Sequence, residues 1–96
     1  MKIAKVVGTA ISTVKEPRLE DTQLLLISEA DQTGKVIGEP YIAMDKIGVG
    51  PDELVIVVHG SSARVASGDS NSPVDAVIVG ILDSLHYNNK TTFKKS

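Results

Sequence analysis

The sequence predicts a mainly β fold, a small barrel of five strands with one short helix. The apolar segments are short and rich in β-branched residues, which favour strands. Glycine, proline, asparagine and aspartate separate these segments, as they do at turns. One segment alone departs from the strand pattern and suits a helical turn. Closing the sheet into a barrel would also remove its exposed strand edges.

The first two strands are expected before residue 30. The first covers Ile3–Val14 and ends at the turn Lys15-Glu16-Pro17. Gly8 lies inside this strand, where a glycine usually marks a bulge or a tight bend. The second strand is the apolar run Leu24–Ile27, and the turn cluster Asp31–Gly34 follows it.

The middle of the chain predicts two more strands and the helix. Pro40–Ile47 is the third expected strand, and Gly48–Asp52 ends it. Leu54–His59 is the fourth. In Gly60–Ala66, serines after a glycine and then alanine and arginine predict a helical turn capped by the serines. A polar loop is expected over Ser67–Pro73.

The last part of the chain is expected to hold one strand and a tail. Val74–Leu85 is predicted as one long strand, with a turn at Asn88-Asn89. A chain of 96 residues is expected to form a single domain, here a barrel over residues 1–87. Residues 88–96 are short and polar, and we expect a solvated C-terminal tail.

The charge distribution distinguishes the expected barrel from its tail. Residues 1–87 hold seven basic and all twelve acidic residues, a balance of −5, although the whole chain has a net charge of −2. The difference comes from three lysines in the tail, Lys90, Lys94 and Lys95. An acidic barrel lacks the basic surface that nucleic-acid-binding proteins present.

The composition also limits the compartment and the partners. The chain has no cysteine, so a disulfide framework and a thiolate metal site are excluded. Its longest apolar run, Ala76–Leu82, is far shorter than the roughly 20 residues of a spanning helix. No signal-peptide pattern follows Met1. We expect a cytoplasmic protein with no membrane partner.

The strand pattern itself indicates an oligomer. A strand that faces water on one side alternates apolar and polar residues. Leu24–Ile27, Leu54–Val58 and Ala76–Val79 do not alternate, so apolar side chains should point outward as well as inward. One helical turn offers little cover for them. Another copy of the chain in a closed ring is the expected cover. The alternative is that the terminal segments fold back over these faces.

No catalytic or metal site is expected. His59, Ser61, Ser62 and Asp75 supply the residue types of a hydrolytic triad, but the sequence has no Gly-x-Ser-x-Gly elbow. The two histidines, His59 and His86, have no His or Cys partner at ligand spacing. We therefore predict that the protein is not an enzyme and uses no cofactor and no metal.

Two features of the sequence suggest ligand binding as an alternative. Gly48-Val49-Gly50 is a lone Gly-x-Gly followed by proline, so the dinucleotide fingerprint is incomplete. The more serious alternative is an OB-type module that binds single-stranded nucleic acid through stacking aromatics in a basic groove. The only aromatic residues are Tyr41, Tyr87 and Phe93, and the barrel is acidic. Both features argue against nucleic acid as a partner.

Arg64 is the one charged residue in the helical segment, and its neighbourhood is apolar. We expect its guanidinium to bind backbone carbonyls or a carboxylate, such as Asp75 or Asp83, within one subunit or between subunits. The alternative is an ordinary surface arginine.

Six short motifs occur in order along residues 2–87. They are Lys5-Val6-Val7-Gly8-Thr9, Leu24-Leu25-Leu26, Ala43-Met44-Asp45-Lys46-Ile47-Gly48-Val49-Gly50, Gly60-Ser61-Ser62-Ala63-Arg64, Pro73-Val74-Asp75-Ala76 and Val79-Gly80-Ile81-Leu82-Asp83. No single motif is decisive, but the ordered set is specific. In this order the motifs resemble the EutN/CcmL family of bacterial microcompartment vertex proteins.

The resemblance implies a barrel of OB-like topology that assembles into homopentamers. Such pentamers cap the vertices of a microcompartment shell beside hexameric and trimeric shell proteins, and they catalyse no reaction. Ser62 makes the helical motif resemble that of catabolic, ethanolamine-utilisation-like members more than that of carboxysome members. The resemblance assigns oligomeric or structural roles to ten positions: Asp45, Gly48, Gly50, Gly60, Ser61, Ser62, Arg64, Asp75, Gly80 and Asp83.

Overall fold

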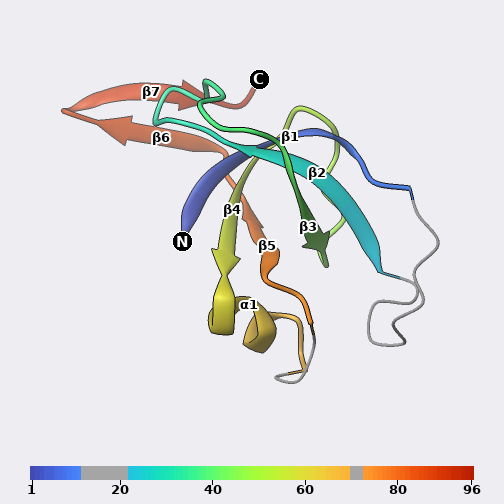
Figure 1. The fold of residues 1–96 in the computed structure, drawn as a ribbon. Coiled ribbons are helices and arrows are strands. Elements are labelled where there is room, and N and C mark those ends of the chain that lie inside the picture. The colour runs from blue at the N-terminus through green and yellow to red at the C-terminus, as the bar shows by residue number, and fades with distance from the viewer. Residues whose placement is uncertain (12–21, 70–72) are drawn as a thin grey trace.

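The computed structural model describes residues 1–11, 22–69 and 73–96. Five strands close into a barrel in the order β1-β2-β3-β5-β4, and β1 also pairs with β4 (Figure 1). These strands are β1 Lys2–Thr9, β2 Gln23–Glu29, β3 Tyr41–Asp45, β4 Leu54–His59 and β5 Ala76–Ile81. Helix α1, Gly60–Ala66, connects β4 to β5. Within the described residues, the predicted mainly β class, the five-stranded OB-like barrel and the one short helix are confirmed.

The first strand is shorter than predicted. β1 ends at Thr9, and residues 12–14 of the expected strand lie outside the described residues, as does the turn expected at 15–17. The pairing of β1 with β2 changes register between Val6 and Gly8, so the bulge expected at this glycine is confirmed. The polar loop expected before β5 also falls partly outside the described residues, at 70–72.

Apolar side chains no larger than leucine fill the interior of the barrel. Successive residues of a strand point to opposite faces, so every second residue points inward. The buried cluster consists of Ala4, Val6, Leu25, Ile27, Ala43, Val49, Val55, Val57, Ala76 and Ile78. Interior side chains from all five strands meet here, as expected in a barrel of this size.

A second buried cluster lies outside the barrel wall, beneath α1. Val58 and Val77 point outward from β4 and β5, and Ala63 of the helix covers them together with Met44 and Val74. These outward side chains made the strand pattern non-alternating. Helix α1 of the same chain buries these side chains. The apolar pattern of β4 and β5 therefore does not by itself require another copy of the chain to cover it.

The C-terminal part of the chain differs most from the prediction. The expected long strand is divided into β5 and a separate strand β6, Ser84–Tyr87. The expected solvated tail contains a further strand, β7 Lys90–Lys94, which pairs with β6. Asn88 and Asn89 adopt positive φ angles of 53° and 62°, as a two-residue hairpin turn requires. The turn signal was correct, but it connects two strands.

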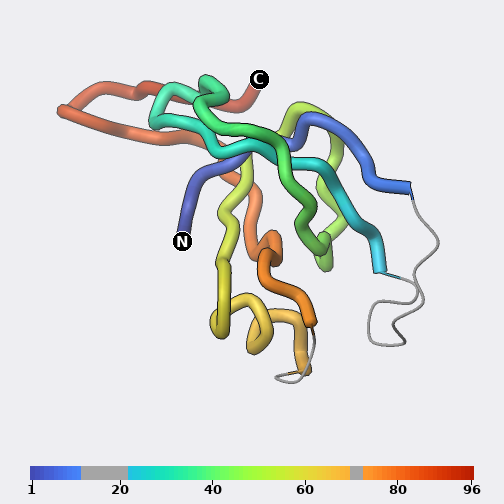
Figure 2. The backbone as a smooth tube through the Cα atoms, in the orientation of Figure 1, coloured from blue at the N-terminus to red at the C-terminus, as the bar shows by residue number. Residues whose placement is uncertain are grey.

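The C-terminal hairpin of β6 and β7 extends away from the barrel (Figure 2). It gives the molecule an elongated shape, with principal extents of 45 × 24 × 21 Å. Phe93 packs at the base of the hairpin, and the end of the chain returns to the barrel through Lys95.

Candidate assembly surfaces

The loop after β3 is organised by one carboxylate. Asp45 is buried, with 6% of its surface exposed. Its Oδ1 accepts hydrogen bonds from the backbone N–H groups of Ile47 and Gly48, at 2.9 and 3.0 Å, and its Oδ2 accepts one from Val49 at 2.8 Å. Gly48 has a φ of +81°, and a Cβ there would meet no atom within 4 Å. The backbone conformation, and not the available space, therefore favours glycine at this position.

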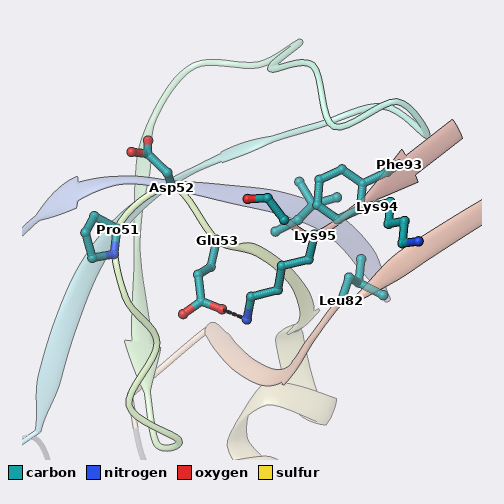
Figure 3. A pocket seen from close by; sticks show the side chains of 9 residues that line it. Pro51, Asp52, Glu53, Leu82, Phe93, Lys94 and Lys95 are labelled. Carbon is teal, nitrogen blue, oxygen red and sulfur yellow. Dashed lines mark hydrogen bonds and ion pairs between the residues drawn. The ribbon is translucent and has the colours of Figure 1, made fainter.

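Gly50 lies in the same loop and hydrogen-bonds to one member of an ion pair. Its N–H donates to Glu53 Oε1 at 3.0 Å, and Lys95 Nζ lies 2.8 Å from Glu53 Oε2 (Figure 3). The hydrogen bond from Lys95, followed by that from the Gly50 amide, lowers the pKa of the Glu53 carboxyl. This pair connects the end of the chain to the loop before β4 and borders a shallow pocket of about 290 Å³ that Leu82 and Phe93 also line.

The junction of β4 and α1 contains the Gly-Ser-Ser-Ala-Arg motif. Gly60 begins the helix with a φ of +62°, and its N–H donates to the Asp75 carbonyl at 3.1 Å. The N-cap position belongs to His59, and no side chain caps the helix. The prediction that the serines cap it was therefore wrong. Ser61 and Ser62 lie in the first turn and are exposed.

His59 forms a contact that the sequence did not predict. Its Nε2 lies 3.0 Å from the Tyr41 hydroxyl, and the two rings are tilted by 42° with centroids 5.7 Å apart. Burial, followed by the positive charge of Lys2, lowers the pKa of His59. Burial also raises the pKa of Tyr41. Among the described residues no hydrogen bond joins His59 to Ser61, so a hydrolytic triad of these residues is not formed there.

Arg64 lies half-buried in the last turn of α1. Across residues 1–11, 22–69 and 73–96, its guanidinium forms no hydrogen bond or ion pair, so neither Asp75 nor Asp83 is its partner within the chain. The Asp75 side chain is exposed beside the β4–α1 junction. Asp83 lies between β5 and β6, where its carbonyl accepts a hydrogen bond from the Lys95 amide at 2.8 Å.

Gly80 lies on the outer face of β5 opposite Ile56 of β4. A Cβ at Gly80 would lie 3.4 Å from Ile56 Cδ1, so the isoleucine covers the glycine. The ten motif positions thus do not form one site. Asp45, Gly48 and Gly50 shape one loop, and Gly80 and Asp83 lie at the end of β5. The other five lie in α1 or, like Asp75, beside its start.

Apolar side chains remain exposed on the outer wall of the barrel. Ile42 of β3 pairs with Leu26 of β2, which in turn pairs with Gly8 beside the bulge residue Val7. Ile42 and Val7 are exposed. On the helix, Val65 is 71% exposed beside a groove that the two motif serines also line. These are among the apolar side chains of the described residues that the chain itself leaves exposed.

The described parts of the chain contain neither a metal-ligand cluster nor a helix that could span a membrane. No group of three or more His, Cys, Asp or Glu side chains is arranged to hold a metal ion there. No helix of that part is long and apolar enough to cross a membrane.

Comparisons with known proteins agree with the fold. The family model described as ethanolamine utilisation protein EutN/carboxysome matches residues 1–83. The carboxysome shell vertex protein CcmL of a Nostoc species is 40% identical over 99% of this chain and 95% of its own length. The bacterial microcompartment shell vertex protein EutN of Salmonella typhimurium is 39% identical over 99% of this chain and 96% of its own length.

Solved structures show the same similarity. An ethanolamine utilization protein EutN superposes with a TM-score of 0.91, 38% identity and full coverage of both chains. The GrpN pentameric microcompartment shell protein from Rhodospirillum rubrum gives a TM-score of 0.81 and 38% identity over 91% of this chain and 99% of its own. The sequence motifs, the closed barrel and these matches together establish that the chain belongs to the EutN/CcmL family of microcompartment shell vertex proteins.

Proposed function

We propose that this chain assembles into a homopentamer that closes a vertex of a bacterial microcompartment shell. The observation that carries the proposal is the match over nearly the whole chain to shell vertex proteins, together with the likeness to a solved pentameric shell protein. A ring of five identical subunits has closed symmetry, in which each subunit contacts its neighbour through two different surfaces.

The structure offers features suited to such contacts. Arg64 has no carboxylate partner among the described residues of its own chain, and it stands on the helix beside the exposed Val65. In the ring, its guanidinium would bind a carboxylate of the next subunit, and Asp75 and Asp83 are both exposed. The buried Asp45 carboxylate holds its loop through three backbone hydrogen bonds, and such a fixed loop suits a structural tile.

The partners of the ring would be the hexameric and trimeric tiles of the same shell, and the role would be geometric, without catalysis. The Nε2 of His59 lies 3.0 Å from the Tyr41 hydroxyl, and within the described residues no hydrogen bond joins His59 to Ser61 or Ser62. Nucleic-acid binding is not favoured, because the aromatic residues are few and only Tyr87 among them is strongly exposed.

We further propose a catabolic, ethanolamine-utilisation-like compartment, on the basis of the exposed Ser62 in the helical motif. Overall identity does not choose between the two classes, since CcmL of Nostoc is 40% and EutN of Salmonella 39% identical. The choice can be tested by exchange. The chain should complement a vertex-protein deletion in an ethanolamine compartment and not one in a carboxysome, and Ser62→Ala should weaken that preference. Complementation of the carboxysome alone would contradict this assignment.

The vertex role can be tested by producing the tile proteins of one shell with and without this chain. Electron microscopy should show closed polyhedral shells with the chain at their corners, and open or elongated shells without it. Closed shells from tiles alone, with the added chain remaining soluble, would contradict the role.

A further inference from the structure

The outer half of the C-terminal hairpin is exposed along its whole length. All six residues from His86 to Thr91 are exposed, and we call this segment the distal arm (residues 86–91). Tyr87, at its centre, is 54% exposed. In Figures 1 and 2 the arm extends beyond the barrel, so the barrel of the same chain does not cover it. The family model ends at residue 83, before the hairpin begins.

The distal arm is nonetheless an ordered structure encoded by the local sequence. The Asn88-Asn89 turn has both residues at positive φ, which matches the twist of the flanking strands. Tyr87 pairs with Lys90 across this turn. Inside the arm, Thr91 Oγ1 lies 3.1 Å from His86 Nδ1. A two-stranded hairpin in water is only marginally stable, so an ordered arm benefits from a surface to pack against.

The base of the hairpin, by contrast, is firmly docked. Phe93 packs against Gly34 so closely that a Cβ on this glycine would lie 2.9 Å from Phe93 Cδ1. Thr92 Oγ1 donates to the Gln32 carbonyl at 2.6 Å, and Lys95 pairs with Glu53 at 2.8 Å. The docked base fixes the direction in which the distal arm points. Five copies in a ring would therefore present five arms in equivalent directions.

The charge of the arm complements that of the barrel. The arm carries Lys90 and no acidic residue, whereas residues 1–87 have a balance of −5. Exposed carboxylates on the barrel include Glu39, Asp52, Asp75 and Asp83. No hydrogen bond or ion pair joins residues 86–91 to the described part of the barrel of the same chain. The barrel of another copy would supply the carboxylates that the arm does not contact in its own chain.

We propose that the distal arm binds the barrel of the adjacent copy, with the Tyr87 ring against its wall and Lys90 beside one of its exposed carboxylates. This rests on the proposed function, because it requires a ring of copies, and it identifies the element that joins neighbours. Such a contact is heterologous: the arm of each subunit meets the barrel of the next, and the ring closes when the last arm meets the first barrel.

The direct test is cross-linking of a mixed ring. Unlabelled chains and chains labelled with nitrogen-15 are unfolded together, refolded and treated with a carbodiimide, which joins an amine to a carboxylate in contact with it. Peptides that contain Lys90 and a carboxylate of opposite label are the expected product. Lys90→Arg should remove them. Cross-links of Lys90 within one chain only, or none while other lysines link chains, would overturn the proposal.

A second test measures the strength of the ring. The double variant Tyr87→Ser with Lys90→Glu should raise the concentration at which native mass spectrometry shows half-dissociation by at least about tenfold, the size expected for one anchor residue and one charge pair. Lys94→Glu makes the same charge change at the docked base of β7 and should have little effect. The proposal would be contradicted if Lys94→Glu raised the half-dissociation concentration as much as the double variant does. It would also be contradicted if the double variant dissociated at the same concentration as the wild type.

The two proposals fail in different ways. A wild-type chain that is monomeric at all concentrations defeats the pentamer itself. A wild-type pentamer whose double variant assembles equally well leaves the pentamer intact and removes only the arm. Unchanged far-ultraviolet circular dichroism of the variant will show that its barrel is folded. The arm proposal would also be overturned if the arm bound a single-stranded oligonucleotide or another shell protein and formed no cross-link between copies.

Discussion

At the scale of single residues, Asp45 determines the shape of a whole loop. Asp45→Asn replaces one of the two carboxylate oxygens by an amide nitrogen, which cannot accept the Val49 hydrogen bond. Loss of charge-assisted bonds at a buried position should lower the free energy of unfolding by about 2 kcal/mol. Asp52→Asn, the same change at an exposed position, is the matched control. Urea unfolding at one fixed protein concentration measures both, and equal stabilities would contradict the assigned role.

Two glycines separate the effect of backbone conformation from that of space. Gly34 and Gly48 have φ angles of +87° and +81°, but only Gly34 lies against another side chain, that of Phe93. Both Gly→Ala variants should lose about 1 kcal/mol from the left-handed conformation. Gly34→Ala should lose more and displace the only phenylalanine of the chain, which its ring resonances report. Equal losses with unchanged Phe93 resonances would contradict the docking of the hairpin base.

Arg64 tests whether a half-buried side chain acts between subunits. Its removal should leave carboxylate acceptors of the neighbour unsatisfied, at a cost of about 1–3 kcal/mol per contact. The ring of the Arg64→Ala variant should therefore dissociate at a higher protein concentration than the wild-type ring. Circular dichroism should show that the dissociated chain remains folded. Arg64→Lys should restore only part of the strength, because lysine lacks the planar fork. An unchanged oligomer and melting temperature would identify Arg64 as a surface charge.

At the scale of elements, the weakest seam of the barrel lies between β3 and β5. These strands are parallel and pair only at Met44↔Val77 and Asp45↔Ile78. β5 begins at Ala76, opposite His59, so Tyr41 has its strand partner on β2 alone. The hydrogen bond between Tyr41 and His59 joins β3 to β4 where β5 has not yet begun. A hydrogen bond between side chains thus joins β3 to β4 beyond the last backbone pairing of β3 with β5.

The partly buried His59 gives the barrel a pH dependence. The pKa of His59 is lowered from its ordinary 6.5 by burial, so the folded chain binds fewer protons than the unfolded chain near that pH. The free energy of unfolding should therefore fall as the pH drops through 6.5 toward the lower folded pKa. His59→Gln should flatten this slope. Unfolding curves between pH 8 and pH 5 measure the slope, and a slope that survives His59→Gln would exclude this origin.

At the scale of the whole molecule, the features that could be predicted from sequence are those that depend on residues close together in the chain. Turn residues and β-branched runs placed all five barrel strands, because strand propensity and turn chemistry act over a few residues. The division after Ile81 and the strand Lys90–Lys94 were missed, because a short polar strand has no apolar run to mark it. The available sequence signal for that hairpin was the pair Asn88-Asn89, because asparagine tolerates the positive φ that a two-residue hairpin turn requires.

The contacts that close the molecule could not be predicted in this way. Tyr41 with His59, and Gly34 with Phe93, are brought together only when the barrel closes and the hairpin docks. The cover that α1 provides to the outward valines also depends on this closure. The strand pattern therefore overstated how much apolar surface needs a neighbour. The number five and the shell came from the family likeness, not from residue spacing.

The proposed vertex role requires five copies of this chain to form a closed ring. Native mass spectrometry of the purified protein, at micromolar concentration and near-neutral pH, measures the number of copies. The main species should contain five copies and should dissociate on dilution without unfolding. A monomer that is stable across the micromolar range, or a ring with another number of subunits, would contradict it.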